Sequence, residues 1–158
     1  MRIVLATGGT AGHIEPALNL GDAIQRAAPD AEVTVIGGTR GLEATLVPDR
    51  GYRLLTVASV PLPRRVSWDL PLVLPRLERA TRAAAEHLRR LRADVVVGFG
   101  GYAALPTYRA AHRLGIPIVV HEANARPGLA NRLASRWTSH RYTTVPGTLP
   151  GAEVLGLP

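Results

Sequence analysis

Short apolar runs rich in β-branched residues alternate along the chain with segments of helical period, and glycine or proline closes each run. This alternation is typical of repeated strand and helix units, whose parallel strands are buried on both faces. A length of 158 residues fits one such domain. We therefore expect a single doubly wound α/β domain of Rossmann type with a mostly parallel sheet. The predicted strands cover residues 3–6, 32–36, 52–57, 94–99, 118–121 and 142–145, with a short last strand at 153–155.

Apolar residues at spacings of three and four predict helices between these strands. The first helix presents Ile14 and Ile24 to the sheet and turns Asp22 toward water. The longest helix has one apolar face and an outward face rich in arginine. The later helices are predicted over 75–92, 103–114 and 128–137.

All 19 basic residues are arginines, and the formal net charge is +7. Such an excess suggests an anionic partner, which could be a phosphate, a nucleic acid or an acidic lipid surface, although a coding bias toward arginine would explain it equally well. The absence of lysine excludes a Walker-type phosphate loop. Seven aromatic residues without a stacking series argue against single-stranded nucleic acid as the partner.

The chain contains no cysteine, which excludes disulfides and thiolate metal sites and is compatible with a reducing compartment. There is no Asp-x-Asp motif and no histidine pair at metal spacing, so neither a metal nor a cofactor is expected. The apolar run after Met1 is too short for a signal peptide, and no stretch approaches the roughly 18 apolar residues that span a bilayer. We expect a cytoplasmic protein that does not cross a membrane.

The first predicted strand ends in a glycine-rich loop at 7–13, Thr-Gly-Gly-Thr-Ala-Gly-His, which leads straight into a helix. Its amides and the positive end of the helix suit a phosphate or diphosphate, although many α/β domains use glycine here only to make the turn. A dinucleotide site is disfavoured, because the Gly-x-Gly-x-x-Gly spacing is missing and no carboxylate ends the second strand. His13 lies where the helix dipole favours a neutral imidazole, so it is a candidate general base, with a structural role as the alternative.

Two further loops bring polar groups to the same edge of the predicted sheet. The fourth strand runs into Gly-Phe-Gly-Gly-Tyr at 98–102, and the fifth into His-Glu-Ala-Asn at 121–124. An imidazole, a carboxylate and an amide directly after an apolar strand are hard to explain by packing, so we favour a ligand site. Because ligands of such sheets bind at the carboxyl ends of the strands, the three loops should share one site.

The proline-rich segment 59–74 carries more large apolar side chains than an irregular loop can bury. We interpret it as a peripheral membrane contact, because apolar residues flanked by arginines suit the boundary between acyl chains and anionic headgroups. A loop folded over the core and a docking surface for another domain are equally good interpretations. The residues assigned to this contact are Leu62, Arg64, Arg65, Val66, Trp68, Leu70 and Leu72.

Five motifs, in order and spacing, resemble the N-terminal domain of the MurG family of bacterial glycosyltransferases over nearly the whole chain. They are Gly-Gly-Thr-Ala-Gly-His with a following Glu-Pro at 8–16, Arg-Gly-Leu-Glu at 40–43, the motifs at 98–102 and 121–124, and Gly-Leu-Ala-Asn at 128–131. The chain departs from the family pattern at Ala11, where the family has glycine, and at Ala123, where it has glutamine. The second departure removes one amide that could touch a ligand.

The resemblance implies the N-terminal half of a GT-B glycosyltransferase. Residues 1–158 would form its acceptor-side domain, and a C-terminal donor-binding domain would lie outside this chain. The family transfers N-acetylglucosamine from UDP-GlcNAc to the 4-hydroxyl of undecaprenyl-diphosphate-linked MurNAc-pentapeptide, with inversion, in peptidoglycan synthesis. A protein of this kind would sit peripherally on the cytoplasmic face of the cell membrane, in contact with anionic lipids.

The resemblance also implies roles for single residues. His13 is the candidate base, and Glu122 is the second choice. Residues of the first loop and Asn124 would reach the donor, while residues 100–102 would hold the acceptor diphosphate. Trp137 would join the membrane contact. The residues expected at the substrates are Thr10, Ala11, Gly12, Asn124, Gly100, Gly101, Tyr102, His121 and Asn131.

Two other functions stay open on the sequence. The chain could be the acceptor-binding and membrane-anchoring subunit of a split, two-chain glycosyltransferase. It could instead be a non-catalytic module that binds anionic lipids. In each case the isolated domain should show no transferase activity, because it lacks the nucleotide-binding half.

Overall fold

The computed structural model describes residues 1–61 and 70–158. They form one seven-stranded sheet in which every neighbouring pair is parallel, with strand order β3-β2-β1-β4-β5-β6-β7. The predicted doubly wound α/β fold is confirmed, and each predicted strand matches an observed one within two residues at either end. The strands are β1 (Arg2–Ala6), β2 (Glu32–Gly38), β3 (Arg53–Val57), β4 (Val95–Gly98), β5 (Ile118–Glu122), β6 (Arg141–Thr143) and β7 (Glu153–Val154).

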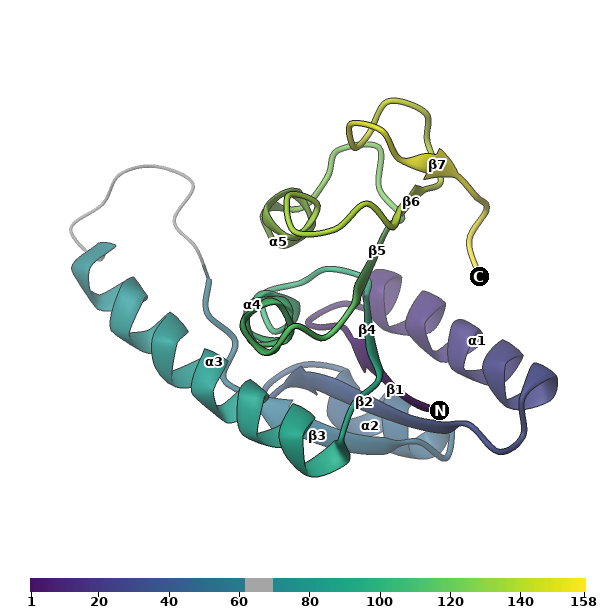
Figure 1. The fold of residues 1–158 in the computed structure, drawn as a ribbon, viewed down its shortest axis with the longest axis horizontal. Coiled ribbons are helices and arrows are strands. Elements are labelled where there is room, and N and C mark those ends of the chain that lie inside the picture. The colour runs from purple at the N-terminus through teal and green to yellow at the C-terminus, as the bar shows by residue number, and fades with distance from the viewer. Residues whose placement is uncertain (62–69) are drawn as a thin grey trace.

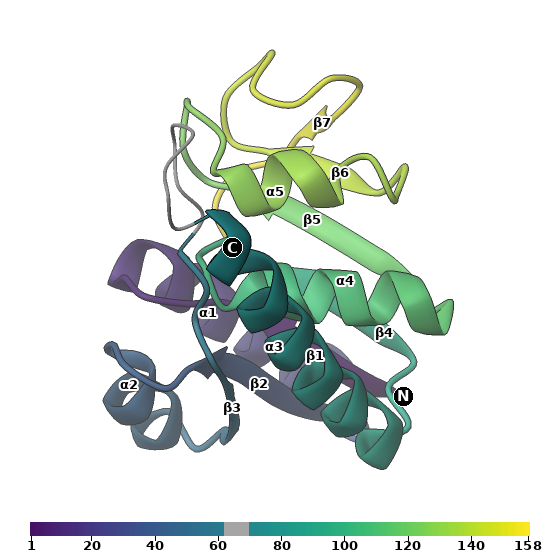
Figure 2. The ribbon, with the colours of Figure 1, turned by 90° about the vertical axis from the view of Figure 1, so that its left-hand side faces the viewer.

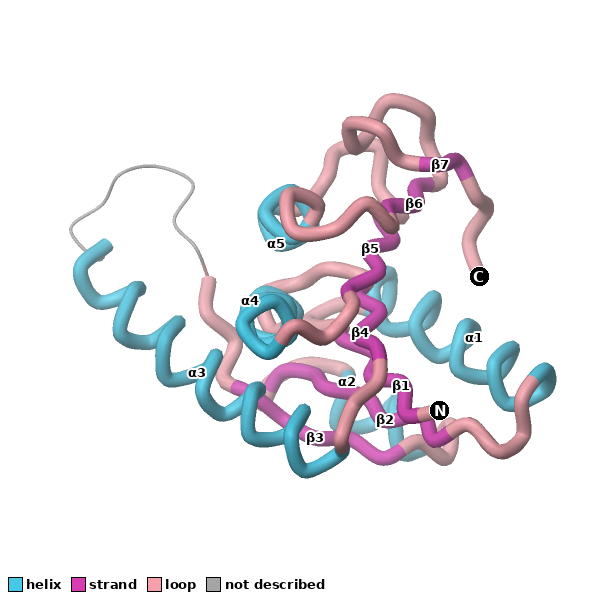
Figure 3. The backbone as a smooth tube through the Cα atoms, in the orientation of Figure 1, coloured by secondary structure: helices cyan, strands magenta, loops and turns pink. Residues whose placement is uncertain are grey.

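Helices cover both faces of the sheet (Figure 1). α1 (Ala11–Ala27) and α2 (Glu43–Asp49) pack on one face, and α3 (Leu70–Leu91), α4 (Ala104–Leu114) and α5 (Leu129–Ala134) on the other. Figure 2 shows these last three helices in front of the stacked strands, and Figure 3 shows the strands running between the two helical layers. Side chains alternate along each strand, so Val4 joins one core and Leu5 the other. This explains why the strands are almost wholly apolar.

The strand order reverses between β1 and β4. Ala6 is paired with Gly98, and Gly98 with Val120, so β1 and β4 end level with one another and β5 runs two residues further at the same edge. In open α/β sheets, ligands bind in the crevice beside such a reversal. The fold therefore brings the loops after these three strands to the place where a ligand site is expected.

The start of the longest helix differs from the prediction. α3 begins at Leu70 and not at Pro75, so the irregular loop expected up to residue 74 is wrong for residues 70–74. Proline is favoured in the first turn of a helix, so Pro75 looks like a helix start in the sequence; in the structure Pro71 has that position and Pro75 lies inside the helix. Val73, one of the large apolar residues of the proline-rich segment 59–74, is only 6% exposed and packs in the core.

Three smaller differences concern local structure. The seven-residue α2 is not predicted, because a helix this short, with Pro48 inside it, gives too little periodicity. α5 ends at Ala134, three residues early. Asp22 does not simply face water: it accepts hydrogen bonds from the Tyr52 hydroxyl at 2.8 Å and from Arg50 at 2.9 Å, and so ties α1 to the segment between α2 and β3. Partial burial and the bond to Asp22 raise the pKa of Tyr52 to about 12.

Candidate functional site

The loops after β1, β4 and β5 meet in a pocket of about 310 Å³ at the carboxyl edge of the sheet. The first two loops touch directly, since a Cβ on Gly101 would collide with the Gly8 carbonyl, and Gly101 also has a φ of 88°. Glycine at this position therefore closes the base of the pocket. The lining residues are Gly8, Gly9, Thr10, His13, Gly101, Tyr102, Leu105, Gly128, Leu129 and Ala130.

The first loop leads into the start of α1, where backbone amides are free. Thr10 is the N-cap residue in an extended conformation, but its side chain makes no capping hydrogen bond. The N–H groups of Ala11 and Gly12 have no acceptor among the described residues. Free amides at the positive end of a helix suit an anionic group such as a diphosphate.

His13 lies in this pocket with its ring held on two sides. Its Nδ1 is hydrogen-bonded to Thr10 Oγ1 at 2.9 Å. The opposite ring edge, Cδ2 and Nε2, lies 3.4 Å from the position that a Cβ on Gly100 would take. The half-buried imidazole therefore sits between the loops after β1 and β4. In this position it could accept a proton from a hydroxyl group bound in the pocket.

Glu122, at the end of β5, is 1% exposed and has donors on both oxygens. Oε1 accepts hydrogen bonds from the backbone and side-chain amides of Asn124, at 3.0 and 2.9 Å. Oε2 accepts from the N–H of Gly128 at 2.9 Å and from the Asn131 amide at 3.0 Å. Four donors fill the acceptor positions of a carboxylate. The side chain thus fixes the loop 123–128 and offers no free lone pair to a substrate proton.

A buried hydrogen-bond chain continues from Glu122 to α4. Asn131 is fully buried, donates also to the His121 carbonyl at 3.1 Å, and accepts from the Tyr108 hydroxyl at 2.7 Å. Burial raises the pKa of Tyr108. Gly98 leaves room for this ring, since a Cβ there would collide with it. These contacts join α4, α5 and the end of β5 behind the pocket.

The side chain of His121 is not brought to this pocket. Side chains alternate along β5, so His121 points to the opposite face of the sheet from Glu122 and packs beside Phe99, with ring centroids 5.5 Å apart. Its Nε2 lies 3.2 Å from the Gly156 carbonyl, and Nδ1 has no partner in the described part of the chain. Burial lowers the pKa of His121. The ring borders a mostly apolar groove of about 510 Å³ along α1.

The other predicted site residues lie at or beneath the pocket surface. Tyr102 is 46% exposed and lines the pocket. Asn124 is exposed, but its amide is already bound to Glu122. Ala11 and Gly12 are exposed at the start of α1. The structure thus gathers residues 10–13 and 100–102 at one site and buries Glu122 and Asn131 behind it.

Two buried residues of this region are missed by sequence reasoning. A single tyrosine in an apolar helix gives no sign that Tyr108 will bond to Asn131. Glu43, at the start of α2, accepts hydrogen bonds from the N–H groups of Gly9 at 2.8 Å and Gly38 at 3.0 Å. The motif at 40–43 was a visible signal for it, but the sequence alone assigns this carboxylate no role.

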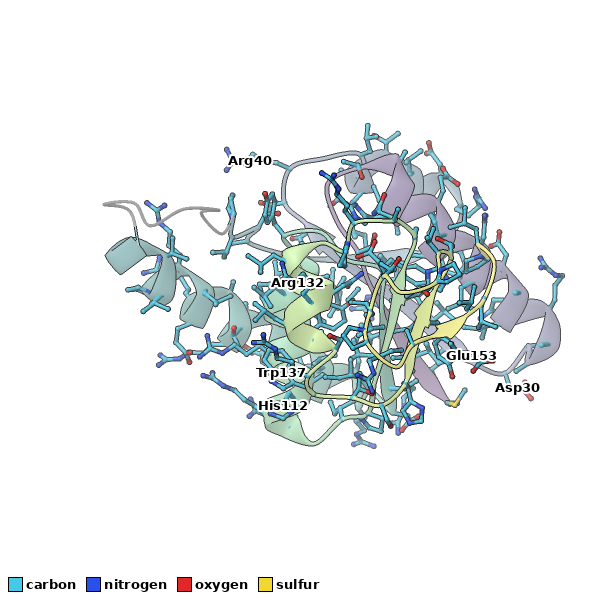
Figure 4. The ribbon with its side chains drawn as sticks, turned by 90° about the horizontal axis from the view of Figure 1, so that it is seen from above. Asp30, Arg40, His112, Arg132, Trp137 and Glu153 are labelled. Carbon is cyan, nitrogen blue, oxygen red and sulfur yellow. The ribbon has the colours of Figure 1, made fainter. Side chains whose placement is uncertain are left out.

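Most of the predicted membrane contact lies outside the described residues, namely Leu62, Arg64, Arg65, Val66 and Trp68. Leu70 and Leu72 belong to the first turn of α3. Trp137 lies at the other edge of the sheet from the glycine loops and stacks on His112, with ring centroids 5.0 Å apart (Figure 4). None of the helices in residues 1–61 and 70–158 is both long and apolar enough to cross a bilayer.

Similarity to known proteins covers almost the whole chain. Residues 3–143 match the model of the glycosyltransferase family 28 N-terminal domain. The whole chain is 54% identical to a protein of Streptomyces avermitilis and 54% identical to one of Thermobifida fusca. Both are named UDP-N-acetylglucosamine--N-acetylmuramyl-(pentapeptide) pyrophosphoryl-undecaprenol N-acetylglucosamine transferase. The chain covers 44% and 42% of these proteins, so it spans less than half the length of the curated relatives it matches.

Solved glycosyltransferases share the fold. MurG of Acinetobacter baumannii matches 98% of the chain with a TM-score of 0.82 at 28% identity, and the chain covers 45% of it. The glycosyltransferase SnogD of Streptomyces nogalater matches 100% of the chain with a TM-score of 0.65, and the chain covers 50% of it; at 20% identity this match shows the fold alone. With the family model matched over residues 3–143, the chain belongs to glycosyltransferase family 28 and carries its N-terminal domain.

Proposed function

We propose that this chain is the acceptor-binding domain of an inverting glycosyltransferase of peptidoglycan synthesis. The reaction would move N-acetylglucosamine from UDP-GlcNAc to the 4-hydroxyl of undecaprenyl-diphosphate-linked MurNAc-pentapeptide. Two relatives with this activity in their names are 54% identical to the whole chain, which supports the assignment. The observation that carries the chemistry is the position of His13, whose ring lies between the loops after β1 and β4 in one pocket.

A second domain would supply most of the donor site. The named relatives are more than twice as long as this chain, which leaves room for a donor-binding half. That half, on the same polypeptide or on a partner subunit, would face the carboxyl edge of the sheet, because the pocket lies there. Residues 1–158 alone should therefore release no UDP.

The loops after β1 and β4 form two facing walls of the pocket, and the reaction involves two diphosphates. The free amides of Ala11 and Gly12, with Thr10 beside them, suit the diphosphate of the donor because they lie at the positive end of α1. Residues 100–102 on the facing loop would hold the diphosphate of the acceptor. Asn124 would contact the donor from the loop after β5.

His13 would act as the general base between these walls. Its imidazole would take the proton of the acceptor hydroxyl while that oxygen bonds to C1 of the sugar and the bond from C1 to the UDP oxygen breaks. Inversion requires one such displacement, so one base and a stabilised leaving group suffice. Glu122 is the second choice, and its four hydrogen bonds favour His13.

The acceptor would be reached at the cytoplasmic face of the membrane. Segment 62–72 combines leucines and Trp68 with Arg64 and Arg65, a composition that suits anionic headgroups above an acyl boundary. Co-sedimentation of the natural protein with anionic vesicles should fall in Trp68→Glu. Equal sedimentation of the variant and the natural protein would favour a segment that packs on protein instead.

Release of UDP tests the assignment. The natural protein that carries residues 1–158 should release UDP from UDP-GlcNAc only when the undecaprenyl-diphosphate-linked MurNAc-pentapeptide is present. Replacing that acceptor by one whose 4-hydroxyl is methylated should stop the release, because no nucleophile is left. Release without an acceptor, or with the blocked acceptor alone, would contradict the proposed transfer.

A further inference from the structure

Glu43 is a fully buried carboxylate that joins two loops of the glycosyltransferase domain. Its Oε1 accepts one hydrogen bond from Gly9, in the loop after β1, and one from Gly38, at the end of β2. Its Oε2 is buried and has no partner within the described residues, and none of the cations described there is paired with this carboxylate. It is not part of the pocket lining. Glu43 thus lies behind the site, not in it.

Four glycines make the space that this side chain occupies. A Cβ on Gly37 would lie 2.9 Å from Glu43 Cγ, and Cβ atoms on Gly38 and Gly8 would lie 3.1 and 3.2 Å from Oε1. A Cβ on Gly41 would collide with Oε2. Of these four, only Gly41 has a positive φ, so the other three owe their identity to space and not to backbone conformation.

This packing decides where the amides of the first loop point. The N–H of Gly9 is turned inward to Glu43 and is not available to a ligand. The next amides, on Ala11 and Gly12, stay free at the start of α1. The bond to Gly9 therefore fixes the point from which α1, with Thr10 and His13, enters the pocket.

We propose that Glu43 is a positioning residue, which holds the first glycine loop so that the α1 amides meet the donor, and His13 the acceptor hydroxyl, in one geometry. This inference rests on the proposed function. Burying a carboxylate without a cation is costly, and an apolar residue would fill the same space at less expense. What an apolar residue cannot supply is a single oxygen that accepts from two loops at once. Misplacement of reacting groups by about 1 Å can lower rates by roughly 100-fold.

Three variants of the natural protein that carries this domain separate positioning from general stability. Glu43→Ala removes the acceptor of both amides. Glu43→Gln keeps it, because an amide oxygen can replace Oε1 while its nitrogen takes the unpartnered place of Oε2. Val47→Ala is the matched control, since Val47 is fully buried one turn further along α2 and lies in the apolar core.

We expect Glu43→Ala to lower kcat/KM for UDP-GlcNAc about tenfold or more, with Glu43→Gln and Val47→Ala within about twofold of the natural protein. Hydrogen exchange should become faster in the peptide 7–14 of Glu43→Ala and stay unchanged in Val47→Ala. Thermal unfolding measured alongside shows how much stability each alanine variant loses. Equal effects of the two alanine variants on kcat/KM and exchange would overturn the inference, as would a loss in Glu43→Gln as large as in Glu43→Ala.

The wild-type measurement separates this inference from the proposed function. If the natural protein shows no acceptor-dependent release of UDP, the function is wrong and the kinetic comparison has no basis. The exchange experiment still applies in that case. Unchanged exchange at residues 7–14 in Glu43→Ala would then show that Glu43 does not hold the loop.

Discussion

Two buried carboxylates hold the loops of this site, and their surroundings differ. Glu122 ends β5 and has two donors on each oxygen, so all of its acceptor positions are filled. Glu43 begins α2 and has two donors on one oxygen and none on the other among the described residues. Neither is paired with a described cation, and neither lines the pocket. Each of them instead holds a loop of the pocket by binding a backbone N–H of that loop.

This difference shows how a conspicuous motif can mislead. Glu122 follows an apolar strand beside a histidine and an asparagine, which favoured a reactive role in the sequence. In the structure, Asn124 and Asn131 donate hydrogen bonds to Glu122, and the ring of His121 points away from it. The imidazole that lines the pocket belongs to His13, and the loop before it turns the N–H of Gly9 inward to Glu43. Reactivity therefore follows from which groups are left unsatisfied.

The largest expected effect is that of His13→Ala. If both carboxylates are structural, the base is His13, and its loss should lower kcat by about 100-fold or more. Steady-state kinetics of the natural protein with saturating UDP-GlcNAc measures this. His140→Ala is the control, because His140 is exposed at the other edge of the sheet and should leave kcat unchanged. An unchanged kcat in His13→Ala would assign the role of base to Glu122 and contradict a purely structural role for that carboxylate.

The next effect distinguishes the two carboxylates directly. In Glu122→Gln the new NH₂ must face a backbone donor whichever way the amide lies, the N–H of Asn124 on one side or that of Gly128 on the other. Both hydrogen bonds to the replaced oxygen are lost and their two donors then face the new NH₂, which should cost about 2 to 3 kcal/mol of unfolding free energy. Glu43→Gln keeps both of its bonds and exchanges one unpartnered polar atom for another, so it should cost less, about 1 kcal/mol. Urea unfolding of the two variants measures the difference. Equal losses of unfolding free energy would show that the number of donors on each carboxylate oxygen does not determine the cost.

Much of the fold, but less of the site, could be predicted from the sequence. The strands could be located because they coincide with local apolar runs such as 95–98, which can be recognised without knowing the tertiary structure. In a parallel sheet the loops after the strands lie at one edge, so the sequence could predict that residues 10–13 and 100–102 share a site. The hydrogen bonds that fill the acceptor positions of Glu122 could not be predicted, because two of them come from Gly128 and Asn131, six and nine residues further along the chain.

Alternation and packing explain the remaining misses. Whether His121 or Glu122 faces the glycine loops depends on the register of β5, and a shift of one residue exchanges them. The bond from Tyr108 to Asn131 joins α4 to α5 and leaves no local pattern. Gly37 and Gly38 read as turn residues in the sequence, although the structure requires them to admit the side chain of Glu43.

Tyr108→Phe tests how far the network of Glu122 extends. The change removes a buried hydroxyl and leaves Asn131 Oδ1 without its donor, which should cost about 1 to 2 kcal/mol. Urea unfolding gives the value, and hydrogen exchange of the loop 123–128 shows whether the loss is felt there. A variant as stable as the natural protein would limit the network to Glu122 and its direct partners.

Tyr52→Phe gives the smallest effect and serves as the counterpart on the other half of the sheet. Its hydroxyl is only half-buried, and Asp22 keeps its contact with Arg50 when the hydroxyl is lost, so the cost should be below that of Tyr108→Phe. The pKa of Tyr52 is raised to about 12 in the folded chain, above its ordinary value near 10. The contribution of this hydroxyl is therefore complete below about pH 10 and is lost as the pH rises through 12. The difference in unfolding free energy between Tyr52→Phe and the natural protein should shrink over that interval, and a constant difference would show that ring packing against Gly21, not the hydrogen bond to Asp22, makes the contact stable.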